Sequence, residues 1–321
     1  MMPARAGRKS WFFRPPPIPF TSGVYGKQGF VRLVEMSDVA AYSPHHDSTY
    51  HNHQHRKTNH RLHPRRLAPP RGVRHRPRPA LPARLRLEAI ALPSIGAEPP
   101  TKSLNDDIEH VHAVLKRLAD DEGRQIVVVC HSYGGLVGAG AVKGVEFVRR
   151  AKTPREEDGK KGGVIMLVYM AAFVVPRGKS LKDMLGGEWL PWMRFDGNYS
   201  RSSAEATIFY NDLPPAEQSK WISKLTHISA GVFTDPATHE PWNDNDGLSL
   251  PCMYLLCEKD KGLPLAVQEQ MARTLGEGVT EYRCDASHSP FLSVPEKVVE
   301  AMEIAARVGA EKSGAGVGLP N

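Results

Sequence analysis

The chain has 321 residues, of which 40% are hydrophobic, so it can bury one large core or two modest ones and is not expected to be disordered throughout. No run reaches the roughly 18 to 20 apolar residues that a membrane-spanning helix needs, and we expect no membrane contact. The net charge of +7 is unevenly placed: residues 1–86 hold 17 Lys and Arg against 3 Asp and Glu, and the remaining residues carry an excess of 7 acidic groups. The body of the chain therefore lacks the positive charge typical of a nucleic-acid-binding protein, and nucleic acid is not an expected partner.

Residues 1–86 are predicted to be an atypical basic segment without a packed core of its own. From His45 to Arg86 the sequence is crowded with His, Arg and Pro and shows neither the helical nor the strand period of apolar residues, so we expect disorder there. A His-rich metal site and an Arg-rich tail with non-specific affinity for nucleic acid remain as alternatives. The acid-free first residues resemble a transit peptide, but their prolines would break its helix. We therefore expect a cytoplasmic protein, with organelle targeting as the alternative.

A compact α/β domain is predicted over residues 87–308, because short apolar runs alternate there with helical patterns. This alternation is typical of a mostly parallel sheet flanked by helices. The predicted strands are Leu87–Leu92, Ile126–Cys130, Val164–Phe173, Met253–Cys257 and Val279–Cys284. The predicted helices are Ser103–Asp121, Gly135–Arg150, Leu265–Leu275 and Pro295–Val308, and a flexible tail is expected over 309–321.

The four cysteines lie in or beside the strand-like runs. Their spacing matches neither a disulfide framework nor a zinc site, so we expect reduced, buried thiols. The pattern of the domain contains no motif for a metal or a cofactor, and none is expected.

The first candidate for catalysis is a serine between a buried strand and a glycine-rich helix start. In IVVVC-HSYGG, Ser132 follows the strand directly, which is the context of a nucleophile elbow: small residues allow a sharp turn that exposes the hydroxyl. The turn points the next backbone N–H, that of Tyr133, at the substrate oxygen as an oxyanion-hole donor. The five residues CHSYG depart from G-x-S-x-G at Cys130, and a helix N-cap serine is the alternative interpretation.

Two further candidates follow later strands. Asp260 comes after the strand MYLLC, at the C-terminal end where parallel-sheet enzymes place functional groups. A carboxylate there can orient a histidine; the alternatives are an Asx-turn or a solvated charge, and Glu258 is a less favoured acid. His288 follows the last strand in CDASHSPF, with a surface histidine as the alternative. The order Ser, Asp, His on loops after three separate strands favours a catalytic triad with His288 as general base.

These residues resemble the α/β-hydrolase family, and within it the branch that holds plant methyl-ester esterases, hydroxynitrile lyases and their bacterial and fungal relatives. The resemblance covers about Leu87 to Val308 and rests on ALPSIGAEPP, HSYGG, YLLCEKDKGLP and DASHSPFLSVPE. It implies an α/β-hydrolase fold. The hydroxynitrile lyases of this branch carry a lysine where this chain has Ser289, which disfavours lyase chemistry. Epoxide hydrolases and dehalogenases in the superfamily use an aspartate nucleophile, which Ser132 rules against.

Residues 176–250 resemble the lid insertion of this family. An aromatic lid would exclude water and form an apolar pocket suited to hydrophobic acyl groups or aromatic esters. The alternative, which we favour for most of the rings, is that they pack the small core of the insertion itself. The segment holds four of the five tryptophans and further aromatic residues, namely Trp189, Trp192, Trp221 and Trp242 with Phe209, Tyr210 and Phe233.

One part of the family pattern is not recognisable. The resemblance implies a first core strand before Leu87, followed by a His-Gly or Pro-Gly-Ala loop that supplies the second oxyanion N–H. The best substitute strand is Phe30–Val34, followed by AAYSPHH without the expected glycine. One hypothesis is that the N-terminal region has been altered at gene level. Loss of one oxyanion donor typically costs on the order of 10² to 10³ in turnover.

Two functions of different classes follow as candidates. The leading one is a carboxylic-ester hydrolase that acts on a small hydrophobic or aromatic ester through an acyl-enzyme. The alternative is a hydrolase-fold ligand-binding protein that keeps the pocket but not turnover, which the missing loop favours. The expected partner is a small-molecule ester, and the sequence predicts no oligomeric state.

Overall fold

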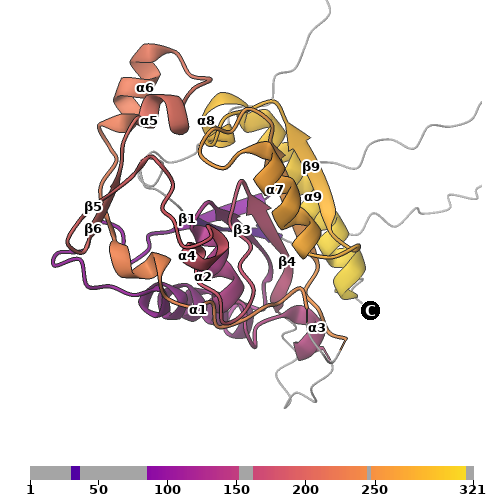
Figure 1. The fold of residues 1–321 in the computed structure, drawn as a ribbon. Helices are drawn as coiled ribbons and strands as arrows, with labels where there is room; N and C mark the ends of the chain where they lie inside the picture. Colours follow the sequence, from indigo (N-terminus) through magenta and orange to yellow (C-terminus); the bar gives the residue numbers. More distant parts are fainter. Residues whose placement is uncertain (1–29, 37–84, 152–161, 244–246, 316–321) are drawn as a thin grey trace, which may run out of the picture.

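A six-stranded sheet forms the centre of the described part of the molecule (Figure 1). The computed structural model describes residues 30–36, 85–151, 162–243 and 247–315. The strands are β1 Phe30–Met36, β2 Leu85–Ile90, β3 Gln125–His131, β4 Gly163–Met170, β8 Cys252–Cys257 and β9 Thr280–Cys284. Their order is β2-β1-β3-β4-β8-β9, and the strands from β3 to β9 run parallel. This confirms the predicted α/β architecture with a mostly parallel sheet.

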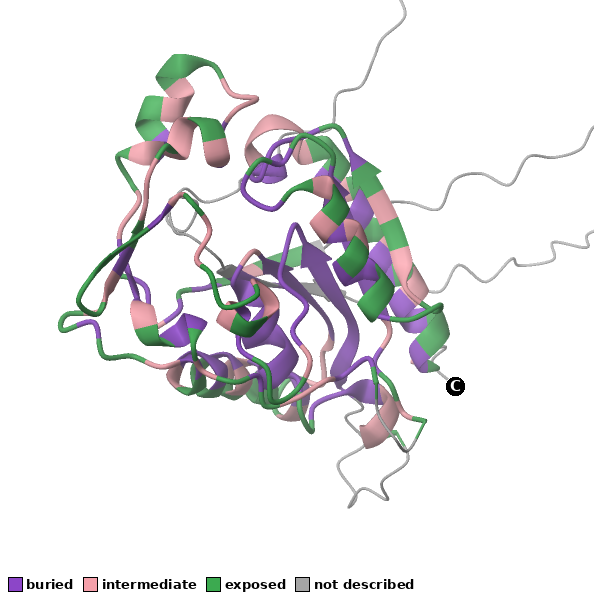
Figure 2. Ribbon diagram, viewed as in Figure 1, coloured by how far each residue is buried: buried purple, intermediate pink, exposed green. Residues whose placement is uncertain are grey.

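Both faces of the sheet are covered, which explains why its strands read as nearly continuous apolar runs. The main covering helices are α1 Leu104–Asp120, α2 Gly134–Ala141, α7 Leu265–Thr274 and α9 Pro295–Ser313. In β3, Val128 and Cys130 share a core with α1, α2 and α7, whereas Val127 and Val129 pack with α9 on the other face. Figure 2 shows the central strands buried, with the exposed residues on the outer sides of the helices.

Of the four predicted helices, α1 and α7 agree closely with the prediction, one is divided in two and one is longer. Ser103, the first residue of the predicted helix, caps α1 and forms a capping box with Asp106. The helix predicted over 135–150 instead divides into α2 and α3 (Phe147–Arg150), because the chain turns at Gly144, whose φ of +81° favours glycine. Helix α9 continues to Ser313, so the tail expected from residue 309 is helical at its start. Across the described ranges, no helix is both long and apolar enough to cross a membrane.

Strand β1 lies between β2 and β3 and runs antiparallel to both. The sheet therefore includes residues from the basic segment 1–86, which the sequence sets apart from the domain. Phe30 pairs with His131, at the end of β3 that leads into Ser132, so β1 ends at the opposite edge of the sheet. Met36, the last residue of β1, therefore lies at the end of the sheet away from Ser132. The disorder predicted for the rest of the N-terminal segment falls outside the described residues.

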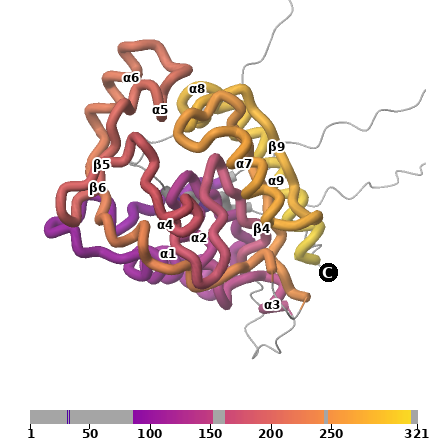
Figure 3. Tube along the Cα trace, in the orientation of Figure 1, coloured from indigo at the N-terminus to yellow at the C-terminus, as the bar shows by residue number. Residues whose placement is uncertain are grey.

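The segment predicted to be an insertion, residues 176–250, forms a layer at one end of the main sheet in its described parts, 176–243 and 247–250 (Figure 1). Figure 3 traces it from α4 through β5 and β6 to α5 and α6, near α8 (Pro290–Ser293). Strands β5, β6 and β7 make a small antiparallel sheet, and Ile228 forms an isolated bridge with Ile95 of the main domain. Its elements are α4 Leu181–Met184, β5 Met193–Asp196, β6 Tyr199–Ser202, α5 Glu205–Ile208, α6 Pro215–Ile222, β7 Ile228–Ser229 and a 3-10 helix Ala230–Phe233.

Candidate active site

Ser132 lies in the sharp turn between β3 and α2. Its φ of +55° is in the left-handed region, which a residue with a side chain rarely adopts, so the surrounding structure must hold the turn. The turn packs against Phe173, whose backbone N–H donates to the Ser132 carbonyl oxygen at 3.1 Å. A Cβ on Gly135 would lie 2.2 Å from the Phe173 carbonyl oxygen, so only glycine allows this close approach. The helix-cap interpretation of Ser132 is wrong, because α2 has no side-chain cap.

The departure from G-x-S-x-G at Cys130 is compensated by a glycine on α2. Cys130 is fully buried on β3 and faces this helix. A Cβ on Gly138 would lie 2.1 Å from the Cys130 sulfur, so the sulfur fills the space that a side chain at position 138 would need. Strand and helix therefore remain close because the small residue is on the helix instead of the strand.

We expect Gly138→Ala to destabilise the protein by about 1–3 kcal/mol, the usual cost of overpacking a core. The variant Cys130→Ala alone should cost less than about 1.5 kcal/mol, because it removes one buried atom. The double variant should be more stable than Gly138→Ala, since the next atoms near a Cβ at position 138 are 3.4 Å or more away. Urea unfolding of the three variants measures these differences. Simple addition of the two single effects would show that the sulfur is not the obstacle.

Asp260 and His288 are in direct contact beyond the carboxyl ends of β8 and β9. The His288 Nδ1 and the Asp260 Oδ2 lie 2.8 Å apart, and both residues are buried. The other carboxylate oxygen accepts hydrogen bonds from the backbone N–H groups of Gly262 and Leu263, at 2.7 and 2.9 Å. The Asx-turn interpretation therefore holds for one oxygen of Asp260, and the histidine contact holds for the other. Glu258 is exposed, and His288 is not a surface histidine.

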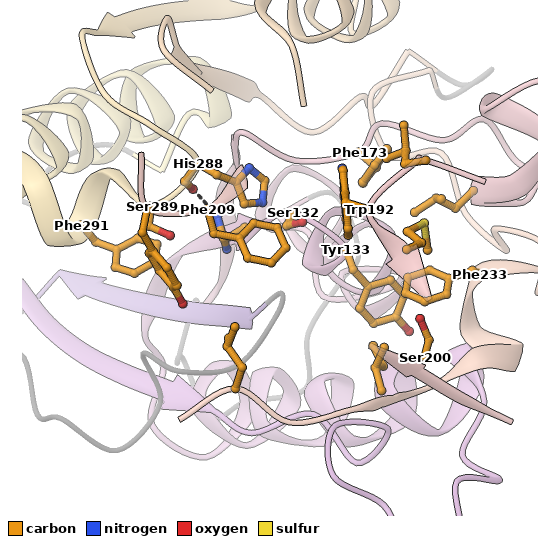
Figure 4. Close-up of a pocket in the computed structure, with 17 residues that line it drawn as sticks. Ser132, Tyr133, Phe173, Trp192, Ser200, Phe209, Phe233, His288, Ser289 and Phe291 are labelled. Carbon is orange, nitrogen blue, oxygen red and sulfur yellow. Dashed lines mark hydrogen bonds between the residues drawn. The ribbon is translucent and has the colours of Figure 1, made fainter. Parts of the chain in front are cut away.

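Ser132 and His288 line one cavity of about 660 Å³, including its open mouth. In Figure 4, Ser132 lies between His288 and Phe209 on one side and Tyr133 and Trp192 on the other. The Ser132 hydroxyl makes no hydrogen bond to the described residues in this structure. Asp260 and His288 are in direct contact, whereas Ser132 and His288 share only the lining of the cavity. Such contacts often tighten only when substrate binds.

The insertion contributes much of the cavity wall. The aromatic residues predicted there divide into two groups, since Trp192, Phe209, Tyr210 and Phe233 line the cavity. Trp242 and Trp221 are buried in two different hydrophobic clusters, and Trp189 packs against the cluster that contains Trp242. The remaining lining residues are His131, Tyr133, Phe173, Leu181, Leu190, Met193, Ser200, Leu225, Ile228, Ser289 and Phe291.

The insertion is also hydrogen-bonded to the loops that carry Asp260 and His288. The Asp212 carboxylate accepts from the Ser287 backbone N–H at 2.8 Å and from the Ser287 hydroxyl at 2.5 Å. The Asn211 side-chain amide donates to the Lys259 carbonyl oxygen at 3.1 Å. Each bond meets the residue immediately before a candidate catalytic side chain.

Two residues that hold the candidate site were missed by the sequence analysis. Gln268 of α7 is fully buried, donates to the Asp260 Oδ2 at 3.4 Å and bonds both the N–H and the carbonyl of Cys257. His131 Nε2 lies 2.7 Å from the His288 carbonyl oxygen, and the two rings are 4.6 Å apart. The signal for Gln268 was its place on the buried stripe of α7 with Met271 and Ala272.

The four cysteines are free and buried, as predicted. Within the described ranges, no group of three or more His, Cys, Asp and Glu side chains is arranged to hold a metal ion. The His-rich stretch that the sequence left open as a metal site lies outside these ranges.

Comparisons with known proteins give the class of the chain. The model of the alpha/beta hydrolase family matches residues 60–301. The alpha/beta hydrolase nvfD of Aspergillus novofumigatus is 32% identical over 223 residues, which are 68% of this chain and 84% of that protein. A probable hydrolase of a Phoma species is 29% identical over 210 residues, 62% of this chain and 77% of that protein. A pyrethroid hydrolase structure from Sphingobium faniae aligns at 21% identity with a TM-score of 0.49, covering 67% of this chain and 82% of its own.

The match to the family model and the similarity to nvfD agree with the mostly parallel sheet and its flanking helices. The chain belongs to the alpha/beta hydrolase family. Its relatives are named hydrolases, which supports hydrolase activity for this chain as well.

Proposed function

We propose that the protein hydrolyses carboxylic esters through an acyl-enzyme on Ser132. The observation that carries the proposal is the contact of 2.8 Å between His288 and Asp260, with His288 and Ser132 in the lining of one cavity. A hydroxyl in a strained turn beside a buried histidine that is oriented by a carboxylate is the arrangement of an activated serine nucleophile.

In the proposed reaction Ser132 attacks the ester carbonyl and His288 takes the hydroxyl proton. The Nδ1–H of the imidazole donates to Asp260, which leaves Nε2 free to accept that proton. The backbone N–H of Tyr133 stabilises the negative charge that develops on the carbonyl oxygen. His288 then returns the proton to the leaving alcohol, and a water molecule releases the acid.

The cavity favours an uncharged, hydrophobic or aromatic ester. Its lining contains no Asp, Glu, Lys or Arg among the described residues and is dominated by aromatic and aliphatic side chains. Burial raises the pKa of the Tyr210 phenol, which therefore stays neutral in the cavity wall. A charged acyl group would lose its hydration without gaining a partner. In this proposal the insertion acts as a lid that excludes water from the acyl-enzyme.

A ligand-binding protein without turnover is the second candidate, and the direction of β1 favours it. Because β1 runs antiparallel to β3, its C-terminal end lies away from Ser132, whereas the family's second oxyanion donor follows a strand that ends beside the serine. This candidate predicts a folded protein that binds hydrophobic esters and releases no alcohol.

The two candidates are separated by a labelling experiment on the full-length protein. We expect turnover of p-nitrophenyl butyrate, and a fluorophosphonate probe should modify one serine, located by peptide mass spectrometry at Ser132. An excess of the ester should slow the labelling, since both reagents need the same hydroxyl. A folded protein with no turnover and no labelling would contradict the esterase proposal and support binding alone.

A further inference from the structure

A buried carboxylate lies behind the candidate site, and its hydrogen-bond donors are all neutral. Asp107 is 0% exposed. It accepts from the Ser94 backbone N–H at 2.8 Å, the Ser94 hydroxyl at 2.6 Å and the Tyr133 hydroxyl at 2.9 Å. Burial raises the pKa of Asp107, and the bonds from Ser94 and Tyr133 oppose this rise. A carboxylate in such surroundings is costly, so its place in the core indicates a role beyond packing.

The position of Asp107 on its helix supports this view. Asp107 lies on the buried stripe of α1 that includes Leu104, Ile108 and Val111, where an apolar residue would pack against the sheet. It is also in the first turn of α1, where the helix dipole favours a negative charge. The helix therefore presents a carboxylate toward the turn at Ser132 from a position that tolerates it.

The Tyr133 side chain is held at both ends. Its ring lies edge-on to Phe233, with centroids 5.8 Å apart, and its hydroxyl is bonded to Asp107. The residue is 3% exposed and directly follows Ser132. Because the side chain cannot turn without breaking the Asp107 contact, the backbone of Tyr133 is held in one orientation. Figure 4 shows its ring extending away from Ser132 toward Phe233.

We propose that Asp107 and Ser94 are positioning residues, which anchor the Tyr133 side chain and thereby aim its backbone N–H at the oxyanion. This inference rests on the proposed ester hydrolysis. The N–H is useful only if it points at the place where charge develops in the transition state, so a loosened anchor lowers kcat more than it weakens substrate binding. The network thus contributes to catalysis from α1 without touching the substrate.

Tyr133→Phe tests the anchor, because it removes the hydroxyl and keeps the ring. We expect kcat for p-nitrophenyl butyrate to fall about tenfold with KM within about twofold, less than the loss of a whole oxyanion donor. The inhibition constant of an aryl trifluoromethyl ketone, which forms a tetrahedral oxyanion on serine, should rise by the same factor. The matched control is Tyr282→Phe, which removes another tyrosine–carboxylate bond, to Glu300 at 2.8 Å, outside the cavity lining. This control should leave kcat unchanged.

Variants of Asp107 test the same anchor from the other side. Asp107→Asn should keep kcat within about threefold, because the amide can hydrogen-bond both hydroxyls while its oxygen accepts the Ser94 N–H. Asp107→Leu should match Tyr133→Phe, and the double variant should be no slower than either, because both remove one interaction. If Asp107→Leu does not fold, the comparison of Tyr133→Phe with Asp107→Asn decides.

Turnover is normalised to the serine that the fluorophosphonate titrates, so a loss of folded protein is not mistaken for a loss of kcat. A wild-type protein without turnover would overturn the proposed hydrolysis and this inference with it. An active wild type with unchanged kcat and inhibitor affinity in Tyr133→Phe would overturn the inference alone. A tenfold fall in kcat with an equal rise in KM would also overturn it, because it indicates a deformed cavity.

Discussion

Ser132→Ala should lower the turnover of a p-nitrophenyl ester by about 10⁴-fold or more, to the level that binding and the oxyanion donor alone support. Alanine removes the hydroxyl oxygen that forms the acyl-enzyme in the proposed reaction, and its methyl group cannot act as a nucleophile. The small side chain fits the same backbone conformation, so the stability of the protein should change little. Stopped assays at high enzyme concentration would measure the residual rate, and urea unfolding would check the fold.

The control for this variant is Ser289→Ala, because Ser289 is a second serine in the lining of the same cavity. It should retain turnover within about threefold. An active Ser132→Ala protein together with an inactive Ser289→Ala protein would identify Ser289 as the nucleophile. Wild-type activity in both variants would contradict catalysis by either serine.

Asp260→Asn should reduce kcat by about 10⁴-fold, as expected when the histidine of a triad takes the wrong tautomer. One oxygen of Asp260 accepts two backbone N–H groups, from Gly262 and Leu263, so the oxygen of an asparagine would be held on that side. Its amide nitrogen would then face the His288 Nδ1 and donate to it. The proton would move to Nε2, and the imidazole could no longer accept the proton of Ser132.

The matched control is Glu258→Gln, two residues earlier on the same loop. Because Glu258 is exposed, the kcat of the Glu258→Gln variant should stay within about twofold of the wild-type value. Steady-state kinetics of both variants at one pH, with circular dichroism to verify folding, make the comparison. Loss of activity in Glu258→Gln together with an active Asp260→Asn protein would show that Glu258, and not Asp260, orients His288.

The core strands and the loops after them could be predicted because their signals are local. The apolar runs at β3, β4 and β8 are buried on both faces, so each reads as a short hydrophobic block followed by a polar loop. Ser132, Asp260 and His288 were candidates because parallel strands deliver the loops at their carboxyl ends to one edge of the sheet.

The direction of β1 could not be predicted in this way. A strand pattern of alternating residues is the same in both directions, so the sequence at Phe30–Met36 indicates a strand but not its orientation. The pairing that determines orientation joins β1 to β2 and β3, which lie far away in the chain. The residues of the strand alone therefore do not indicate which strands it pairs with or in which direction it runs.

The buried polar residues Gln268 and Asp107 were missed for another reason. Each lies on the apolar stripe of a helix, where a polar side chain interrupts the hydrophobic pattern. The sequence shows the interruption, but not the Asp260 carboxylate or the Tyr133 hydroxyl that each residue meets. Only the packing of the helix against the sheet identifies these partners.

The bonds from Asp212 to Ser287 and from Asn211 to Lys259 limit how this enzyme can diversify. A replacement of residues 176–250 by the corresponding segment of a relative would change the cavity wall and remove both bonds at once. The new segment would then have to supply an acceptor for the Ser287 N–H, or leave that buried residue unsatisfied beside His288. New specificities should therefore arise more readily from single exchanges within the wall than from exchange of the whole segment.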